Sequence, residues 1–349
     1  MTMDDIRTVD RSGMHALLRG FPTQVREAIV IGAAAGLPRR NSAIRSIVLT
    51  GLGGSAIGGD LLKSYLADEL GVPMLVNRHY TLPRFVGRST LVIVSSYSGN
   101  TEETIAAHAE AMKRHARVLC ISSGGTTLRR ARRSSTPFIL IPGGLPPRAA
   151  LGYSFFPLLI SLSRMGFITS KDRAITETIR LLERNAATYA DPSATDNRAL
   201  QLAYLLKHRM GIIYSSTERF DAVAARWRGQ MAENAKTLMF GHVIPEMNHN
   251  ELVGWNVLKD QMRELQVIFL RDREDHRRVT MRMDFTRGII ANSTPRIAEA
   301  WSEGTSRLAR IFSLVQLGDW VSFYLAILHN VDPTPVEVID QLKEELARA

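Results

Sequence analysis

The chain has 349 residues, 45% of them hydrophobic and 22% charged, which fits a globular protein of about two domains of roughly 100–200 residues each. No run reaches the ~20 apolar residues of a membrane helix, and the single Cys120 excludes an internal disulfide and a cysteine-based zinc site, so we expect a cytoplasmic protein that binds no membrane. The net charge of +10 comes from scattered basic residues without the clustered footprint of a nucleic-acid-binding protein, and it would attract a phosphorylated metabolite.

The first half of the chain predicts strands that alternate with helices. A helical region with loops is expected over residues 1–45. Apolar, β-branched runs then predict strands, and helical spacing of apolar residues predicts helices between them. The strands are expected at 46–50, 72–76, 90–96, 116–122 and 138–142, and the helices at 60–70 and 102–114. This alternation is typical of an α/β fold with a doubly wound, mostly parallel sheet.

The second half repeats the pattern after a helical region. Residues 153–209 predict a helical bridge with a loop at 191–197. The same order of elements then returns about 165 residues after its first appearance. Strands are expected at 210–214 and 266–270, and helices at 220–236, from 276, at 301–328 and at 335–346. We therefore expect two such domains related by duplication, over 1–152 and 210–349, joined by the bridge.

A glycine-rich segment, TGLGGSAIGGD, follows the first predicted strand and leads into a helix. Gly53 and Gly54 would let backbone N–H groups approach an anion at the helix N-terminus, and Ser55 could donate its hydroxyl. The spacing is neither that of a dinucleotide fingerprint nor that of a Walker loop. The alternative is a glycine-rich packing turn, which is common where a strand meets a helix.

A second polar turn, SSYSGNTEE, follows the third predicted strand and also opens a helix. Ser96, Ser98 and Thr101 place three hydroxyls in this turn, next to a helix N-terminus that attracts an anion. Alone, the segment could equally be an ordinary capped helix start. Two such turns on strands of one sheet favour a cradle for a phosphate group.

These two segments resemble those of the sugar isomerase (SIS) domain family, and most closely the bifunctional phosphoglucose/phosphomannose isomerases. The resemblance runs from about residue 47 to the last helix. It implies an aldose–ketose isomerase that interconverts glucose 6-phosphate, and mannose 6-phosphate too, with fructose 6-phosphate in glycolysis and gluconeogenesis. The resemblance implies neither a metal nor a cofactor.

The resemblance also assigns two residues to the chemistry. Arg148 lies in the segment PPRAALG, where the two prolines restrict the backbone. From its sequence alone it could equally be an ordinary surface arginine with no role in catalysis. In the family this arginine stabilises negative charge on the enediolate. Glu233 lies in a predicted helix, and by its spacing alone it would be a solvated glutamate paired with Lys236 three residues on. The resemblance makes Glu233 the general base.

Two further residues are assigned by the same resemblance. The string NHNE contains His249, which matches the ring-opening histidine of the family. With Glu251 alone as a neighbour it would make a poor metal site. In the family the neighbouring subunit supplies this histidine, which implies a homodimer. Lys343 matches a catalytic lysine of the final helix, although a plain surface lysine is the alternative.

Other functions fit the sequence less well. A non-catalytic phosphosugar-binding SIS regulator would need the cradle but not Glu233, His249 and Lys343 together, and it usually carries a DNA-binding module. Other SIS isomerases would not be expected to carry the NHNELVGW element in a second SIS-like half. A dehydrogenase is disfavoured because the dinucleotide fingerprint is missing. The basic stretch 129–133 is interpreted as a solvated helix.

Overall fold

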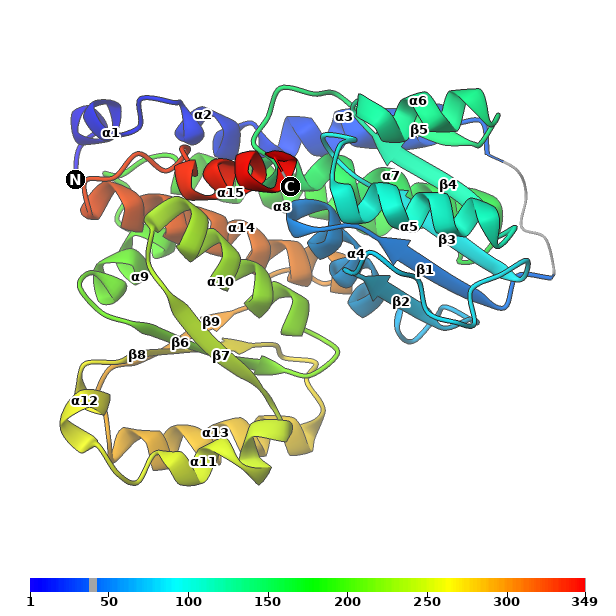
Figure 1. Cartoon of the computed structure of the whole chain (residues 1–349). Coiled ribbons are helices and arrows are strands. Elements are labelled where there is room, and N and C mark those ends of the chain that lie inside the picture. The colour runs from blue at the N-terminus through cyan, green and yellow to red at the C-terminus, as the bar shows by residue number, and fades with distance from the viewer. Residues whose placement is uncertain (38–42, 349) are drawn as a thin grey trace. The chain divides into compact units, whose positions relative to one another are not determined.

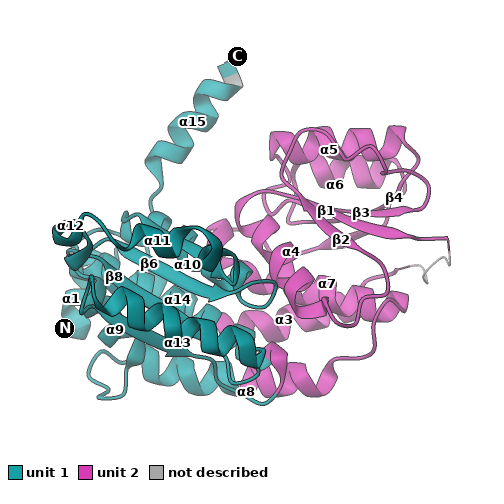
Figure 2. Cartoon of the chain, turned by 90° about the horizontal axis from the view of Figure 1, so that it is seen from below, with its two compact units in different colours: residues 1–19, 181–305, 309–349 teal, residues 20–180, 306–308 magenta. Residues whose placement is uncertain are grey.

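The computed structural model describes residues 1–37 and 43–348. The chain forms two compact units, shown in teal and magenta in Figure 2. Unit 1 consists of residues 1–19, 181–305 and 309–349, and unit 2 consists of residues 20–180 and 306–308. The N-terminal residues 1–19 thus belong with the second sheet, and residues 153–180 of the expected bridge belong with the first. The domain bounds expected from the sequence stay a prediction.

Unit 2 contains a five-stranded sheet of order β2-β1-β3-β4-β5 in which the paired strands are parallel. Its strands are β1 (Ser46–Thr50), β2 (Met74–Asn77), β3 (Thr90–Ser95), β4 (Arg117–Ser122) and β5 (Phe138–Leu140). β3 is buried along its whole length, which explains why its sequence is a continuous apolar run. The α/β class and the parallel sheet expected from the sequence are confirmed.

Helices cover both faces of this sheet. α5 (Glu102–Lys113) and α6 (Gly125–Arg133) lie on one face, and the remaining helices lie on the other (Figure 2). The latter are α3 (Phe21–Ala34), α4 (Gly53–Leu66) and α7 (Leu151–Met165), and α8 (Asp172–Tyr189) follows them in the chain. A 3₁₀ turn, η1 (Pro147–Ala149), leads into α7. The basic stretch 129–133 forms the exposed end of α6, apart from the buried Ala131.

Unit 1 contains a four-stranded sheet of order β7-β6-β8-β9, again with parallel pairing. Its strands are β6 (Gly211–Ser216), β7 (Met239–Ile244), β8 (Gln266–Arg271) and β9 (Ile297–Trp301). α10 (Asp221–Ala235) and α14 (Arg307–Leu328) lie on one face and α13 (Arg277–Ala291) on the other (Figure 1). Numbered within each unit, both sheets begin with the order 2-1-3-4, which fits a duplication.

Shorter helices complete unit 1. They are α1 (Met3–Val9), α2 (Met14–Arg19), α9 (Arg198–Leu206), η2 (Glu246–His249), α11 (Glu251–Gly254), α12 (Lys259–Arg263) and the C-terminal α15 (Glu337–Arg348). α14 alone among the described helices has the length and apolar composition of a membrane span. Because 94% of its most apolar window is buried within the protein, α14 is explained as a core helix.

Three sequence-based expectations need correction. The helix after β1 begins at Gly53, not near residue 60, so most of the glycine-rich segment is helical. The run 301–328 is not one helix, because Trp301 ends β9 and α14 begins at Arg307. β7 and β9 were not expected as strands at all; both are edge strands with partly exposed residues.

Candidate active site

The glycine-rich segment and the serine-rich turn lie at the same edge of the sheet in unit 2. The first follows the carboxyl end of β1 and the second follows the carboxyl end of β3, and these two strands are parallel neighbours. The sheet order reverses between β1 and β3, since β2 lies on one side and β4 on the other. The crevice outside such a switch point is where open α/β sheets bind their ligands.

The N-terminus of α4 is suited to an anion. Leu52 precedes the helix, and its hydrocarbon side chain cannot cap the N–H groups of the first turn. Gly53 has a φ of +50°, a backbone conformation that glycine adopts without strain. The first N–H groups of this 14-residue helix therefore lie at the switch-point edge. Together with the positive end of the helix dipole, they favour the binding of a phosphate there.

Gly54 brings the arginine-bearing loop against this helix. A Cβ atom at Gly54 would lie 2.5 Å from the Pro147 carbonyl oxygen and 3.3 Å from the Arg148 nitrogen. Only a residue without a side chain permits this approach. Arg148 is 4% exposed, so its side chain is buried rather than extended into solvent as that of a surface arginine would be. The structure thus places the Arg148 loop against the glycine-rich segment.

The hydroxyls of the serine-rich turn are fixed by hydrogen bonds. The Ser96 and Thr101 hydroxyls are 3.1 Å apart, and Ser96 also accepts from the Gly99 N–H at 3.1 Å. The exposed Ser98 hydroxyl accepts from the Asn100 N–H at 3.3 Å. These bonds set the shape of the turn just before α5 begins at Glu102.

Tyr97, which was not expected from the sequence to belong to the site, connects the segments at this edge. Its N–H donates to the Ser55 hydroxyl at 3.1 Å, and its own hydroxyl accepts from the Leu145 N–H at 3.1 Å. Its carbonyl oxygen accepts from the Ser123 side chain at 2.6 Å. The segments that follow β1, β3, β4 and β5 therefore meet at one residue. In the sequence, the only indication of this role is that Tyr97 places an aromatic ring with a polar hydroxyl inside a turn of small residues. Burial raises the pKa of its phenol, which stays protonated.

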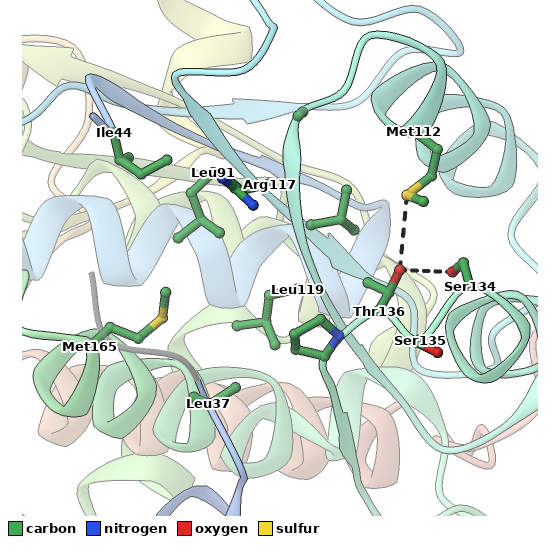
Figure 3. Close-up of a pocket in the computed structure, with 13 residues that line it drawn as sticks. Leu37, Ile44, Leu91, Met112, Arg117, Leu119, Ser134, Ser135, Thr136 and Met165 are labelled. Atoms are coloured by element: carbon green, nitrogen blue, oxygen red, sulfur yellow. Dashed lines mark hydrogen bonds between the residues drawn. The ribbon is translucent and has the colours of Figure 1, made fainter. Parts of the chain in front are cut away.

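A cavity of about 420 Å³ in unit 2 lies at the opposite edge of the sheet. Leu91 at the start of β3 and Arg117 at the start of β4 line it, together with Met165 (Figure 3). These are the amino ends of the strands, whereas the serine-rich turn follows their carboxyl ends. This cavity is therefore separate from the candidate site.

Glu233 lies in unit 1, half-buried in the last turn of α10. The Lys236 ammonium donates to the Glu233 carbonyl oxygen at 2.5 Å and to the Pro335 carbonyl oxygen at 2.7 Å. α15 starts two residues later, at Glu337. The end of α10 and the start of the Lys343 helix are thus joined.

His249 lies at the other end of the second sheet. It is exposed and ends η2, which follows the carboxyl end of β7. α10 leaves the carboxyl end of β6 and returns to the start of the parallel β7, so Glu233 lies toward the amino ends of these strands. The six residues of β7, about 20 Å in length, therefore separate the two levels within one chain.

Lys343 is exposed on α15, and its ammonium donates to Asp340 at 2.8 Å. α15 extends away from the other elements of unit 1 (Figure 2). Val338, Leu342 and Leu346 form an exposed apolar stripe along it, with exposed fractions of 77%, 59% and 52%. The structure does not place Lys343 against His249.

Comparisons with known proteins identify the family. A protein from Caldicellulosiruptor bescii named bifunctional phosphoglucose/phosphomannose isomerase is 42% identical over 94% of this chain and 97% of its own length. A protein of the same name from Aquifex aeolicus is 35% identical over 87% of this chain and 91% of its own length. This chain belongs to the bifunctional phosphoglucose/phosphomannose isomerase family. The family model described as the bacterial phospho-glucose isomerase C-terminal SIS domain matches residues 195–346.

Comparison with solved structures supports the fold. A hypothetical protein from Thermus thermophilus has the same fold, with a TM-score of 0.76 at 17% identity over 99% of this chain and 93% of its own. The resemblance to phosphoglucose/phosphomannose isomerases expected from the sequence is therefore confirmed. In the part of the chain that the structure describes, no three His, Cys, Asp or Glu residues are grouped to hold a metal ion. The roles of the individual residues stay predictions.

Proposed function

We propose that this chain is a metal-independent aldose–ketose isomerase that interconverts glucose 6-phosphate and mannose 6-phosphate with fructose 6-phosphate. The observation that carries the proposal is the phosphate cradle at the switch point of a chain that is 42% identical to a named phosphoglucose/phosphomannose isomerase. Both turns of the cradle open helices at one sheet edge, where an anionic sugar tail is stabilised.

The cradle is proposed to hold the phosphate by two kinds of donor, backbone N–H groups and side-chain hydroxyls. Gly53 and Gly54 offer backbone N–H groups at the start of α4, and Ser98 and Thr101 offer hydroxyls at the start of α5. Ser55 accepts a bond from Tyr97, which occupies an acceptor site on the oxygen and leaves the hydroxyl proton to donate. Ser96 supports the turn through its bond with Thr101.

The proton transfer is proposed to use one carboxylate and one guanidinium. Glu233 removes the proton from C2 of the open-chain aldose, giving an enediolate, and returns it to C1, giving the ketose. Arg148 stabilises the enediolate oxygen, because fixed positive charge counts most where negative charge develops. Glucose and mannose 6-phosphates differ only in configuration at C2. Removal of that proton from either epimer gives the same enediol.

Ring opening is assigned to His249, assisted by Lys343. Imidazole exchanges protons near neutral pH, which suits acid–base transfer between the ring oxygen and the anomeric hydroxyl. Because His249 and Glu233 lie at opposite levels of β7, one chain alone is poorly arranged to bring them to a single sugar. This supports the proposal that His249 acts in the site of a second copy.

The surface beside His249 is suited to such a copy. A groove between α11 and α13 is lined by apolar and basic side chains, namely Leu252, Arg278, Met281, Arg282 and Phe285. The Asn248 amide, next to His249, donates to Thr286 of α13 at 2.7 Å. Exposed apolar side chains border it: Val253 is 76%, Met281 51% and Phe285 64% exposed. Large exposed apolar patches mark interfaces. We propose that this face forms a homodimer.

The isomerase assignment is tested by incubating purified protein with glucose 6-phosphate and mannose 6-phosphate and following fructose 6-phosphate. We expect turnover of both, unchanged by a chelator. Turnover that a chelator abolishes would contradict the metal-independent reaction, and binding without turnover would favour a non-catalytic phosphosugar regulator. The same metabolic role fits a cytoplasmic location, which stays a proposal.

The close approach at Gly54 gives a further expectation. In Gly54→Ala the new Cβ would meet the Pro147 oxygen at 2.5 Å, so α4 and the Arg148 loop must separate. We expect kcat/KM to fall about 10²-fold, since displacement of a catalytic group by about 1 Å costs that much. Steady-state kinetics measures it.

Gly71→Ala is the matched control for that variant, because a Cβ at Gly71 meets no atom within 4 Å. It should keep the parent kcat/KM and melting temperature. If Gly54→Ala retained full activity as well, the glycine-rich segment would be a simple packing turn.

A further inference from the structure

A row of buried polar side chains joins α10 to α14 within unit 1. Arg226, Gln230 and Asn234 recur every fourth residue, so they share one face of α10, and each is at most 5% exposed. Arg226 donates two bonds to the Asp319 carboxylate, at 2.9 and 2.8 Å, and Gln230 donates another at 2.8 Å. One turn on, the Asn234 amide donates to the Ser322 hydroxyl at 2.9 Å. We call these five residues the polar seam.

The two helices also approach closely beside the seam. A Cβ atom at Gly318 would lie 2.2 Å from the indole nitrogen of Trp227. That nitrogen donates to the Leu314 carbonyl oxygen at 2.8 Å. The indole therefore lies against the backbone of α14, and α10 has little freedom to slide along it.

Stability alone does not explain such a seam. Buried ion pairs are often replaceable by well-packed apolar residues without loss of stability. Apolar contacts are non-directional, whereas hydrogen bonds require a set distance and angle. The seam therefore specifies the rotation and the axial position of α10 more narrowly than apolar packing would.

Glu233 directly precedes Asn234, the last seam residue of α10. We propose that the polar seam positions Glu233 for proton transfer. The inference rests on the proposed role of Glu233 as the base. The seam residues are positioning residues: each acts by fixing the last turn of α10, and the substrate is contacted by Glu233. The seam residue within that turn, Asn234, is bonded to Ser322 on the buried face of α10.

The decisive variant is Ser322→Ala, which removes the acceptor of the Asn234 amide and little volume. Ser313→Ala is its matched control on the same helix. Each hydroxyl donates at 2.7 Å to the carbonyl three residues back and accepts one bond, but the donor to Ser313 is the Glu303 N–H rather than a residue of α10. Both serines are at most 3% exposed.

We expect Ser322→Ala to lower kcat about tenfold or more, because small displacements of a catalytic group are costly. Its dissociation constant for fructose 6-phosphate should stay within about twofold, since phosphate anchoring does not involve α10. The pH dependence of kcat should shift as well, because the environment of the base changes. Ser313→Ala should lower the melting temperature similarly and leave kcat and its pH dependence unchanged.

A second variant, Gln230→Met, removes one bond to Asp319 and keeps a side chain of similar length. Like Ser322→Ala, it should lower kcat and leave the dissociation constant for fructose 6-phosphate nearly unchanged. It tests the seam proposal if Ser322→Ala does not fold. Should both variants match Ser313→Ala in kcat while Glu233→Gln is inactive, the seam proposal alone is overturned. Activity retained in Glu233→Gln would instead overturn the base assignment, and the seam proposal with it.

Discussion

Replacement of Glu233 by glutamine is expected to lower isomerase turnover by about 10²–10⁴-fold, the contribution of a positioned general base. Glutamine has nearly the same shape as glutamate but cannot accept the C2 proton. The loss should therefore appear in kcat, with binding of the sugar phosphate nearly unchanged. Steady-state kinetics with glucose 6-phosphate and calorimetric titration with fructose 6-phosphate measure the two quantities.

Glu264→Gln is the control for charge removal in the same unit. Glu264 is exposed and forms a surface ion pair with Arg296 at 3.4 Å, a type of contact that contributes little to stability. This variant should keep the parent kcat and melting temperature. Full turnover in Glu233→Gln would show that another group removes the proton.

The first sheet could be predicted because its signals are local. The β3 strand is buried along its length, and such strands are continuous apolar runs in sequence. β7 and β9 are the edges of the second sheet, where partly exposed positions carry mixed residues such as those in MFGHVI and IAEAW. Edge strands therefore lose the apolar pattern on which the prediction depends.

The start of α4 could not be predicted for a different reason. Glycine disfavours helices by about 1 kcal/mol per residue, so GGSAIGGD looks like a loop. In the fold, a Cβ at Gly58 would lie 2.7 Å from the Ser154 hydroxyl, and one at Gly59 would lie 2.8 Å from Leu49. These glycines let α4 pack closely on α7 and β1. These tertiary contacts override the low helix propensity of glycine, and they cannot be inferred from the neighbouring sequence.

The same distinction applies to the site. The hydroxyls of Ser96, Ser98 and Thr101 were predictable because they fall within six consecutive residues. The approach of Gly54 to Pro147 joins segments far apart in sequence, and so do the bonds of Tyr97 with Ser55 and Leu145. The bond from the Lys236 ammonium to the Pro335 carbonyl oxygen likewise joins residues nearly 100 positions apart. Non-local bonds of this kind have no local signature.

Isomerase activity is expected to return when two inactive variants are combined in one dimer. If His249 serves the site of a second copy, Glu233→Gln and His249→Ala chains should restore each other in a mixed dimer. One of its two sites would then contain both Glu233 and His249, and the other would contain neither. Random pairing of equal amounts should therefore give about a quarter of the parent activity from two nearly inactive proteins. Coexpression with two different tags and assay of the mixture measures it.

A chain carrying both substitutions tests the same arrangement from the opposite direction. Mixed with an equal amount of parent chain, it should leave about a quarter of the activity, because every mixed dimer then pairs each Glu233 with a missing histidine. If Glu233 and His249 instead acted within one chain, the double variant would leave about half the activity and the two single variants would not complement each other. The exposed position of His249, beside the groove of α11 and α13 and its exposed apolar side chains, favours the first outcome.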